Sequence, residues 1–208
     1  TRPYRGMKLE DIEILHALHE WKVEADYSSA VRLLEPFVRQ LEQKEDSLAN
    51  RNKYYRPLSY LKEKLLLWEI KQQVDSVNVG DSVRPYLKKD MLEGVYCDDG
   101  RRTYYWEGNQ MINTLIAYRI IKNDPSLCKL KENMQLYILR TKERGWNTYQ
   151  ASSAVATVLT DLLAGSGGMS GTSVSVSGKD HQRITEFPYH ARLTAGDSLL
   201  ISKTGKEP

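Results

Sequence analysis

Apolar residues recur at intervals of three and four from residue 9 to residue 164, and this periodicity restricts the fold more than any other feature. Such spacing places apolar side chains on one face of an α-helix. We predict seven helices, which start near residues 9, 27, 56, 80, 108, 126 and 147. Alternate starts lie roughly 40 to 50 residues apart, a period typical of helical hairpins that stack on one another. Residues 1–164 are therefore expected to form a mainly α domain of helical hairpins.

The buried faces of the first two helices follow from the same spacing. We expect these faces to be lined by Ile12, Leu15, His19 and Val23, and by Ala30, Leu33, Leu34, Phe37 and Leu41. The fourth helix is predicted between Gly80 and Gly94, with Val83, Leu87 and Met91 on its apolar face. After it, "VYCDDGRRTYYWEG" has Asp99 and Gly100 between an apolar and an aromatic run, which predicts a short hairpin.

The composition of the chain changes at Gly165. The segment "GSGGMSG", residues 165–171, is typical of a flexible joint. The strict alternation of Val174 and Val176 in "TSVSVSGKD" then predicts a β-strand, and "RITEFPYHARLT" and "SLLIS" predict two more. Residues 172–208 are therefore expected to be a β-strand segment of a following domain.

The charge balance limits the partners of the chain. Its 208 residues include 30 Lys and Arg against 27 Asp and Glu, a net charge of +3. Because the basic residues are scattered among acidic ones, nucleic acid is not expected as a partner. No apolar run approaches the roughly 18 residues that a membrane span requires. The first residues lack the pattern of a signal peptide, and both ends lead us to expect a piece of a longer protein.

His16, His19 and Glu20 have residue types that bind metals. Two imidazoles three residues apart could reach one ion, with the carboxylate beside them. His19, however, lies on the predicted apolar face of the first helix. We therefore expect half-buried structural histidines and no metal.

Asp98, Asp99 and Glu107 lie close together in a segment that also contains Tyr104, Tyr105 and Trp106. Carboxylates beside aromatic rings are typical of glycosidases, which use a pair of acids on a sugar. A simpler explanation is that Asp99 and Gly100 form a turn while the rings pack on neighbouring helix ends. We expect the simpler explanation to hold.

The two cysteines, Cys97 and Cys128, are too few and too far apart for a disulfide framework or a zinc site. We expect two free thiols, with a single disulfide as the alternative. Neither cysteine is followed three residues later by glutamine, so neither can form a thioester with that spacing. "GSGGMSG" also lacks the Lys and Ser/Thr that end a phosphate-binding loop. We therefore expect no catalytic residue, thioester, cofactor or metal in this chain.

The last predicted helix begins in "GWNTYQASSAVATVL". Asn147 is expected to cap this helix and Gln150 to reach back to it, which together form a capping box. The apolar stripe that follows contains Ala151, Ala154, Val155, Val158, Leu159, Leu162 and Leu163. Trp146 is expected to lie over the helix end.

Four segments resemble the alpha-2-macroglobulin family, especially its bacterial members. They are "YYWEGNQMINTLIAYRIIKNDPS", "WNTYQASSAVATVLTDLLA", "VSVSGKD" and "LTAGDSLLISKTG". Positions that match the family pattern are Trp146, Thr148, Ala151 and Ser152, and positions that depart from it are Tyr149, Ser153 and Ser177. The resemblance extends from Tyr104 to about Gly205, whereas residues 1–100 match only as helical hairpins. The departures suggest a divergent member.

This resemblance implies the later part of an α/α toroid of helical hairpins, followed by strands that lead into the rest of the protein. It implies a non-enzymatic role in trapping proteases, exerted by the full-length parent in the periplasm, in the cell envelope or at the cell surface. Other domains of the same chain would be its partners. The thioester of the family lies upstream of the matched part and is not implied here. A toroidal carbohydrate-active enzyme using Asp98, Asp99 or Glu107, and a structural or interaction module of an envelope protein, stay open as alternatives.

Overall fold

The computed structural model describes residues 6–103, 110–142, 147–165, 173–177, 181–184 and 200–204. The chain divides into two compact units, Thr1–Val158 and Leu159–Pro208. Glu107 and the aromatic residues Tyr104, Tyr105, Trp106 and Trp146 lie outside the described residues.

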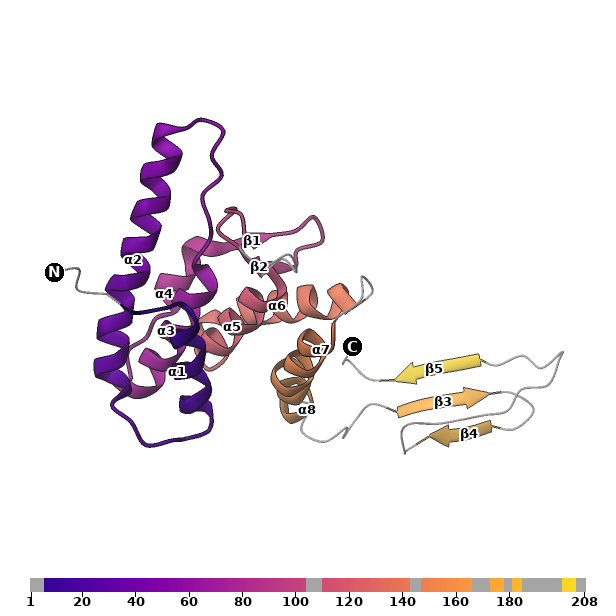
Figure 1. Cartoon of the computed structure of the whole chain (residues 1–208). Helices are drawn as coiled ribbons and strands as arrows, with labels where there is room; N and C mark the ends of the chain where they lie inside the picture. The colour runs from indigo at the N-terminus through magenta and orange to yellow at the C-terminus, as the bar shows by residue number, and fades with distance from the viewer. Residues whose placement is uncertain are drawn as a thin grey trace. The chain divides into compact units, whose positions relative to one another are not determined.

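The first unit is mainly helical, as the periodicity predicts (Figure 1). Its α-helices are α1 (Glu10–Glu20), α2 (Tyr27–Arg51), α3 (Leu61–Asp75), α4 (Gly80–Val83), α5 (Gln110–Ile121), α6 (Cys128–Thr141) and α7 (Thr148–Ala154). Two short 3-10 turns, η1 (Arg84–Tyr86) and η2 (Pro125–Leu127), precede a strand and α6 respectively. Strands β1 (Leu87–Lys89) and β2 (Val95–Cys97) form an antiparallel pair.

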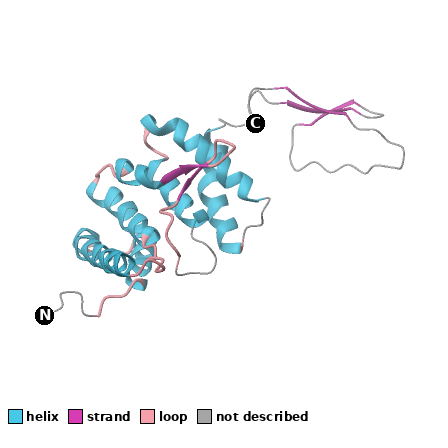
Figure 2. Ribbon diagram, turned by 90° about the horizontal axis from the view of Figure 1, so that it is seen from above, coloured by secondary structure: helices cyan, strands magenta, loops and turns pink. Residues whose placement is uncertain are grey.

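The core of this unit is centred on α3 and α5. Helix α3 contacts α1, α2 and α5, and its side chains Leu61, Leu65, Leu67 and Ile70 are fully buried. Burial of one such side chain stabilises the fold by about 1.5 to 3 kcal/mol. The β1–β2 pair lies among the helices in Figure 2, because β2 packs against both α5 and α6.

The first two helices occur where they are predicted, but their buried faces differ in detail. Asp26 caps α2 by accepting a hydrogen bond from the backbone N–H of Ser29 at 3.0 Å. The prediction that Leu33 is buried is wrong, because 51% of it is exposed. Val23 is also exposed, since α1 has already ended at Glu20. Val31 and Val38 are buried instead, because the contact with α3 sets the rotation of α2.

The prediction of one long fourth helix between Gly80 and Gly94 is wrong. Helix α4 ends at Val83, and Pro85 in the following turn has no backbone N–H with which to continue an α-helix. Leu87 therefore begins β1, and Met91 lies in the β1–β2 turn with its side chain fully exposed.

The predicted hairpin around Asp99 and Gly100 is described only in its first arm and its turn. Gly100 does form a turn, with φ of 74°, and Asp99 Oδ1 accepts a hydrogen bond from the N–H of Arg101 at 3.0 Å. The strand before it pairs backward along the chain with β1, and residues 104–107, the second arm of the predicted hairpin, lie outside the described residues. The turn between β1 and β2 is stabilised by Asp90, whose Oδ1 accepts hydrogen bonds from two backbone N–H groups of that turn.

The last helix has the predicted start. Asn147 Oδ1 accepts a hydrogen bond from the N–H of Gln150 at 2.8 Å, and Gln150 Oε1 accepts one from the N–H of Asn147 at 3.2 Å. The predicted capping box is therefore confirmed. After α7, a π-helical segment η4 (Val155–Leu159) precedes α8 (Thr160–Gly165). Val155 is exposed rather than on the buried stripe, while Ala154 and Val158 are buried.

The second unit contains α8 and a three-stranded antiparallel sheet. The strands are β3 (Ser173–Ser177), β4 (His181–Ile184) and β5 (Leu200–Thr204), in the order β4-β3-β5. Strand β3 lies within the first predicted strand, and β5 overlaps "SLLIS" at residues 200–202. Strand β4 shares residues 183–184 with "RITEFPYHARLT", and the later residues of that segment lie outside the described part of the chain. Val174 pairs with Ile184 on one side and with Lys203 on the other. Across the described ranges, no helix combines the length and the apolar character needed to span a membrane.

Candidate functional site

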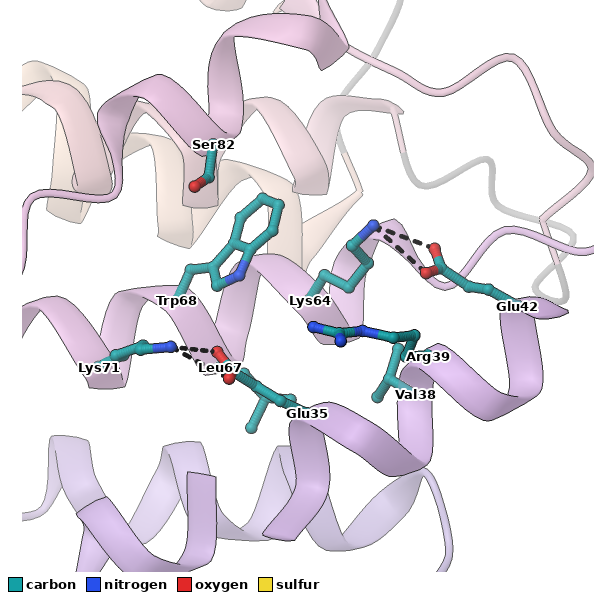
Figure 3. A pocket seen from close by; sticks show the side chains of 9 residues that line it. All are labelled: Glu35, Val38, Arg39, Glu42, Lys64, Leu67, Trp68, Lys71 and Ser82. Atoms are coloured by element: carbon teal, nitrogen blue, oxygen red, sulfur yellow. Dashed lines mark hydrogen bonds and ion pairs between the residues drawn. The ribbon is translucent and has the colours of Figure 1, made fainter. Parts of the chain in front are cut away.

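A polar groove lies between α2 and α3 and encloses a cavity of about 300 Å³ (Figure 3). Its lining residues are Glu35, Val38, Arg39 and Glu42 from α2, Lys64, Leu67, Trp68 and Lys71 from α3, and Ser82 from α4. Val38 and Leu67 lie beneath it and are each only 1% exposed, so the accessible lining of the groove is mainly polar and charged.

Two ion pairs connect the helices across this groove. Lys71 Nζ lies 2.9 Å and 3.0 Å from the two carboxylate oxygens of Glu35. Lys64 Nζ lies 3.1 Å and 3.4 Å from those of Glu42. The glutamates are two helical turns apart on α2, and the lysines are two turns apart on α3, so the pairs hold the helices antiparallel.

Lys64 also lies between two aromatic rings. Its Nζ is 5.5 Å from the ring centroid of Trp68 and 4.9 Å from that of Tyr86, and it donates a hydrogen bond to Tyr86 Oη at 2.7 Å. Burial acts to lower the pKa of Lys64, but the bond to Tyr86 and the charge of Glu42 outweigh it and raise that pKa. The ammonium group of Lys64 is therefore already bound by its own chain.

Arg39 is placed differently from these two lysines. It lies four residues after Glu35 and three before Glu42, spacings at which helical ion pairs form. Both glutamates bind lysines of α3 instead, and in Figure 3 Arg39 extends across the groove toward Trp68. Within the described part of the chain, the guanidinium of Arg39 has no hydrogen-bond or ion-pair partner.

Two further donors in the groove are also uncommitted. The indole N–H of Trp68 and the hydroxyl of Ser82 make no hydrogen bond to any residue that the structure describes. Three cations and two carboxylates line the groove, which leaves one positive charge in excess. The arrangement can therefore bind a hydrogen-bond acceptor that carries a single negative charge.

A second polar cluster is buried between α1, α3 and α5. Glu69 Oε2 lies 2.9 Å from His16 Nε2, and both oxygens of Glu69 accept hydrogen bonds from Arg119. Burial alone would raise the pKa of Glu69, but the bonds to Arg119 and His16 lower it to about 2. The cluster is a buried ion network in which Glu69 stays charged.

The structure brings His16 together with Glu20 and Glu69 rather than with His19, the partner that its spacing allows. Ligand atoms of His16, Glu20 and Glu69 lie within 4.8 Å of one another, a geometry that could hold an ion. Arg119, however, occupies both oxygens of Glu69 and supplies the positive charge that a metal would bring. His19 is half-buried and packs edge-on against Tyr27, with ring centroids 4.9 Å apart.

The two described carboxylates of the glycosidase hypothesis have structural roles. Asp98 Oδ2 accepts a hydrogen bond from Lys88 Nζ at 2.8 Å. Asp99 Oδ2 accepts one from Ser59 Oγ at 2.7 Å, which ties this loop to the residues before α3. One oxygen of Asp98 and both oxygens of Asp99 therefore have hydrogen-bond partners within the chain.

Both cysteines are free thiols, as expected. Cys97 is buried in β2, and burial raises its pKa to about 12, so its thiol is protonated and inert. Cys128 is exposed at the start of α6, with its Sγ 4.0 Å from Glu132 Oε1.

The groove and the buried network contain residues that the sequence reasoning missed, namely Arg39, Trp68, Glu69 and Arg119. A signal for the groove does exist in the sequence. Glu35, Arg39 and Glu42 repeat the intervals of Lys64, Trp68 and Lys71, so two helices in antiparallel contact would match opposite charges at both ends. For Glu69 and Arg119 no local signal exists, since fifty residues separate them.

Comparisons with protein-family models, with curated proteins and with solved structures give no match to this chain.

Proposed function

We propose that this chain is a non-enzymatic part of a bacterial alpha-2-macroglobulin-like protein, which traps proteases in the periplasm or at the cell envelope. The chain would supply the later part of an α/α toroid and the strands that follow it. The observation that carries this proposal is the capped helix that begins at Asn147 and precedes the sheet β4-β3-β5. This order of elements is the one that the resemblance implies.

Details of the same region support the proposal. The capping box fixes the start of α7 next to the position of Trp146, the aromatic residue of the family pattern. Small residues follow it, and Ala154 is fully buried, which lets a neighbouring helix approach closely. Strand β3 contains the two alternating valines of "VSVSGKD".

The ion pairs and the burial of the reactive side chains support a non-enzymatic role. Glu69 is neutralised by Arg119, and Asp98 by Lys88, while the thiol of Cys97 is buried. Their positions are explained by packing and ion pairing.

The test is an encounter between the full-length parent protein and an endopeptidase. We expect the protease to cut the parent at one confined region and then to stay associated with it. The retained protease should still cleave a small chromogenic peptide while losing activity toward a large protein substrate. A parent that is cut at many sites and retains no protease would contradict the proposal.

The two alternatives can be separated from this proposal by direct assays. A carbohydrate-active enzyme requires activity on a polysaccharide panel that disappears in Asp99→Asn, and the bond from Ser59 to Asp99 does not favour it. A purely structural module of the envelope would show neither polysaccharide cleavage nor protease retention.

A further inference from the structure

The ion pairs across the groove between α2 and α3 leave the guanidinium of Arg39 available to a ligand. Arg39 stands between two glutamates on its own helix, and both of them are held by lysines of α3. An exposed arginine at such spacings ordinarily pairs along its helix. Here the cross-helix pairs remove both of its partners, and Arg39 extends toward Trp68 (Figure 3).

We propose that this groove binds a polypeptide segment of a partner protein through one carboxylate side chain. Arg39 holds the carboxylate with two parallel N–H donors, the geometry in which guanidinium and carboxylate groups match. An apolar side chain next to that carboxylate packs on the half-buried ring of Trp68.

The charge of the groove selects a carboxylate over a phosphate group. The lining carries one excess positive charge, which a singly charged acid neutralises. A phosphate group with nearly two negative charges would leave an unbalanced negative charge in the groove. The free indole N–H of Trp68 and the hydroxyl of Ser82 add donors suited to the same acceptor.

The size and lining of the groove select a peptide over a free small acid. A cavity of about 300 Å³ exceeds the volume of one carboxylate and leaves the ring of Trp68, which is only half-buried, to be covered. A peptide with an acidic residue flanked by apolar ones would form the ion pair and also cover the ring of Trp68. Burial of that apolar area adds to the binding free energy of the ion pair. This binding role rests on the groove alone and stands whether or not the protein traps proteases.

The test is an NMR titration of the 208-residue chain with two blocked tripeptides, Phe-Glu-Leu and Phe-Gln-Leu. The signal to follow is the indole N–H of Trp68, identified by its loss in Trp68→Phe. We expect the glutamate peptide to shift this signal at millimolar concentration. The glutamine peptide should bind about tenfold more weakly, because it lacks the charged acceptor.

Variants of Arg39 and a matched control complete the experiment. Arg39→Gln should weaken the glutamate peptide about tenfold without affecting the glutamine peptide, and Arg39→Lys should give an intermediate loss because it keeps only the charge. Arg51→Gln, which removes an exposed cation at the far end of α2, should leave binding unchanged. Circular dichroism would check that each variant folds.

Three results would overturn the proposal. The first is equal binding of the two peptides, and the second is an unmoved Trp68 signal in the presence of the glutamate peptide. The third is a response to acetate or inorganic phosphate alone that equals the response to the peptide, which would assign the groove to a free anion.

Discussion

Glu69 accepts two hydrogen bonds from Arg119, whose Nε lies 2.6 Å from Oε1 and whose Nη2 lies 2.8 Å from Oε2. The carboxylate belongs to α3 and the guanidinium to α5, so this pair joins the two central helices of the first unit. Only 4% of the Glu69 side chain is exposed. Neither charge can be removed without leaving the other in a poorly solvated place.

Glu69→Gln should therefore destabilise the fold by about 3 kcal/mol, because it leaves the charge of Arg119 without its partner. Urea unfolding followed by circular dichroism would measure the loss. The matched control is Glu132→Gln, which breaks an exposed pair with Lys129 and should cost less than about 1 kcal/mol. Equal losses in the two variants would show that the Glu69 pair is no stronger than a surface one.

The same carboxylate should make stability depend on acid. Its pKa is about 2 in the folded chain, against 4.5 for an ordinary glutamate, so the folded state binds this proton less readily than the unfolded state. The stabilisation is complete above pH 4.5 and declines as the pH falls toward 2. Unfolding free energies measured across this window should fall for the wild type and fall less for Glu69→Gln. If the unfolding free energies of the wild type and Glu69→Gln fell in parallel with pH, Glu69 would not be the source of the acid dependence.

Glu63 should behave in the opposite sense. It is buried in α3, its Oε2 has no hydrogen-bond partner among the described residues, and burial raises its pKa. Because its charged form is disfavoured in the folded state, Glu63 destabilises the fold increasingly as the pH rises above 4.5, the ordinary value of a glutamate. Glu63→Met, with a similar volume and no charge, should raise the free energy of unfolding at neutral pH by about 1 kcal/mol. A destabilised variant would mean that the second oxygen of Glu63 is satisfied in solution.

The two thiols should differ in reactivity. Cys128 is exposed, whereas Cys97 is buried with a pKa of about 12. A chromogenic disulfide reagent should therefore modify one thiol in the native chain and two in denaturant, without any reductant. Cys128→Ser should abolish the native reaction and Cys97→Ser should leave it unchanged. If no thiol reacts even in denaturant, the cysteines form a disulfide in solution.

Most helices were predictable because amphipathic spacing is a local property of the sequence. The fourth helix was not, because Val83, Leu87 and Met91 keep the helical interval across Pro85. The missing N–H of that proline ends the helix, and Leu87 pairs with Cys97 in the β1–β2 pair instead. The rotation of α2 about its axis could not be predicted either, because it depends on the contact with α3, which buries Val38 and leaves Leu33 exposed.

The candidate groove could be predicted only in part. Its charges repeat at matching intervals, which indicates that α2 and α3 pair, but the choice of partner for each glutamate depends on how the two helices face each other. The availability of Arg39 follows from that choice, and no single-helix pattern contains it. Asp99 was expected to form a turn with Gly100, and the structure adds Lys88 as the partner of Asp98 and Ser59 as a partner of Asp99.

Helix α5 is buried on nearly every side, with contacts to α3, α4, α6, α7 and β2. A helix with so little polar surface cannot be stable while any of these neighbours is detached. The first unit should therefore open as a whole rather than hairpin by hairpin, in contrast to an array of independent repeats. Its folding would then be a single cooperative transition. Amide hydrogen exchange should be slowest along residues 113–121.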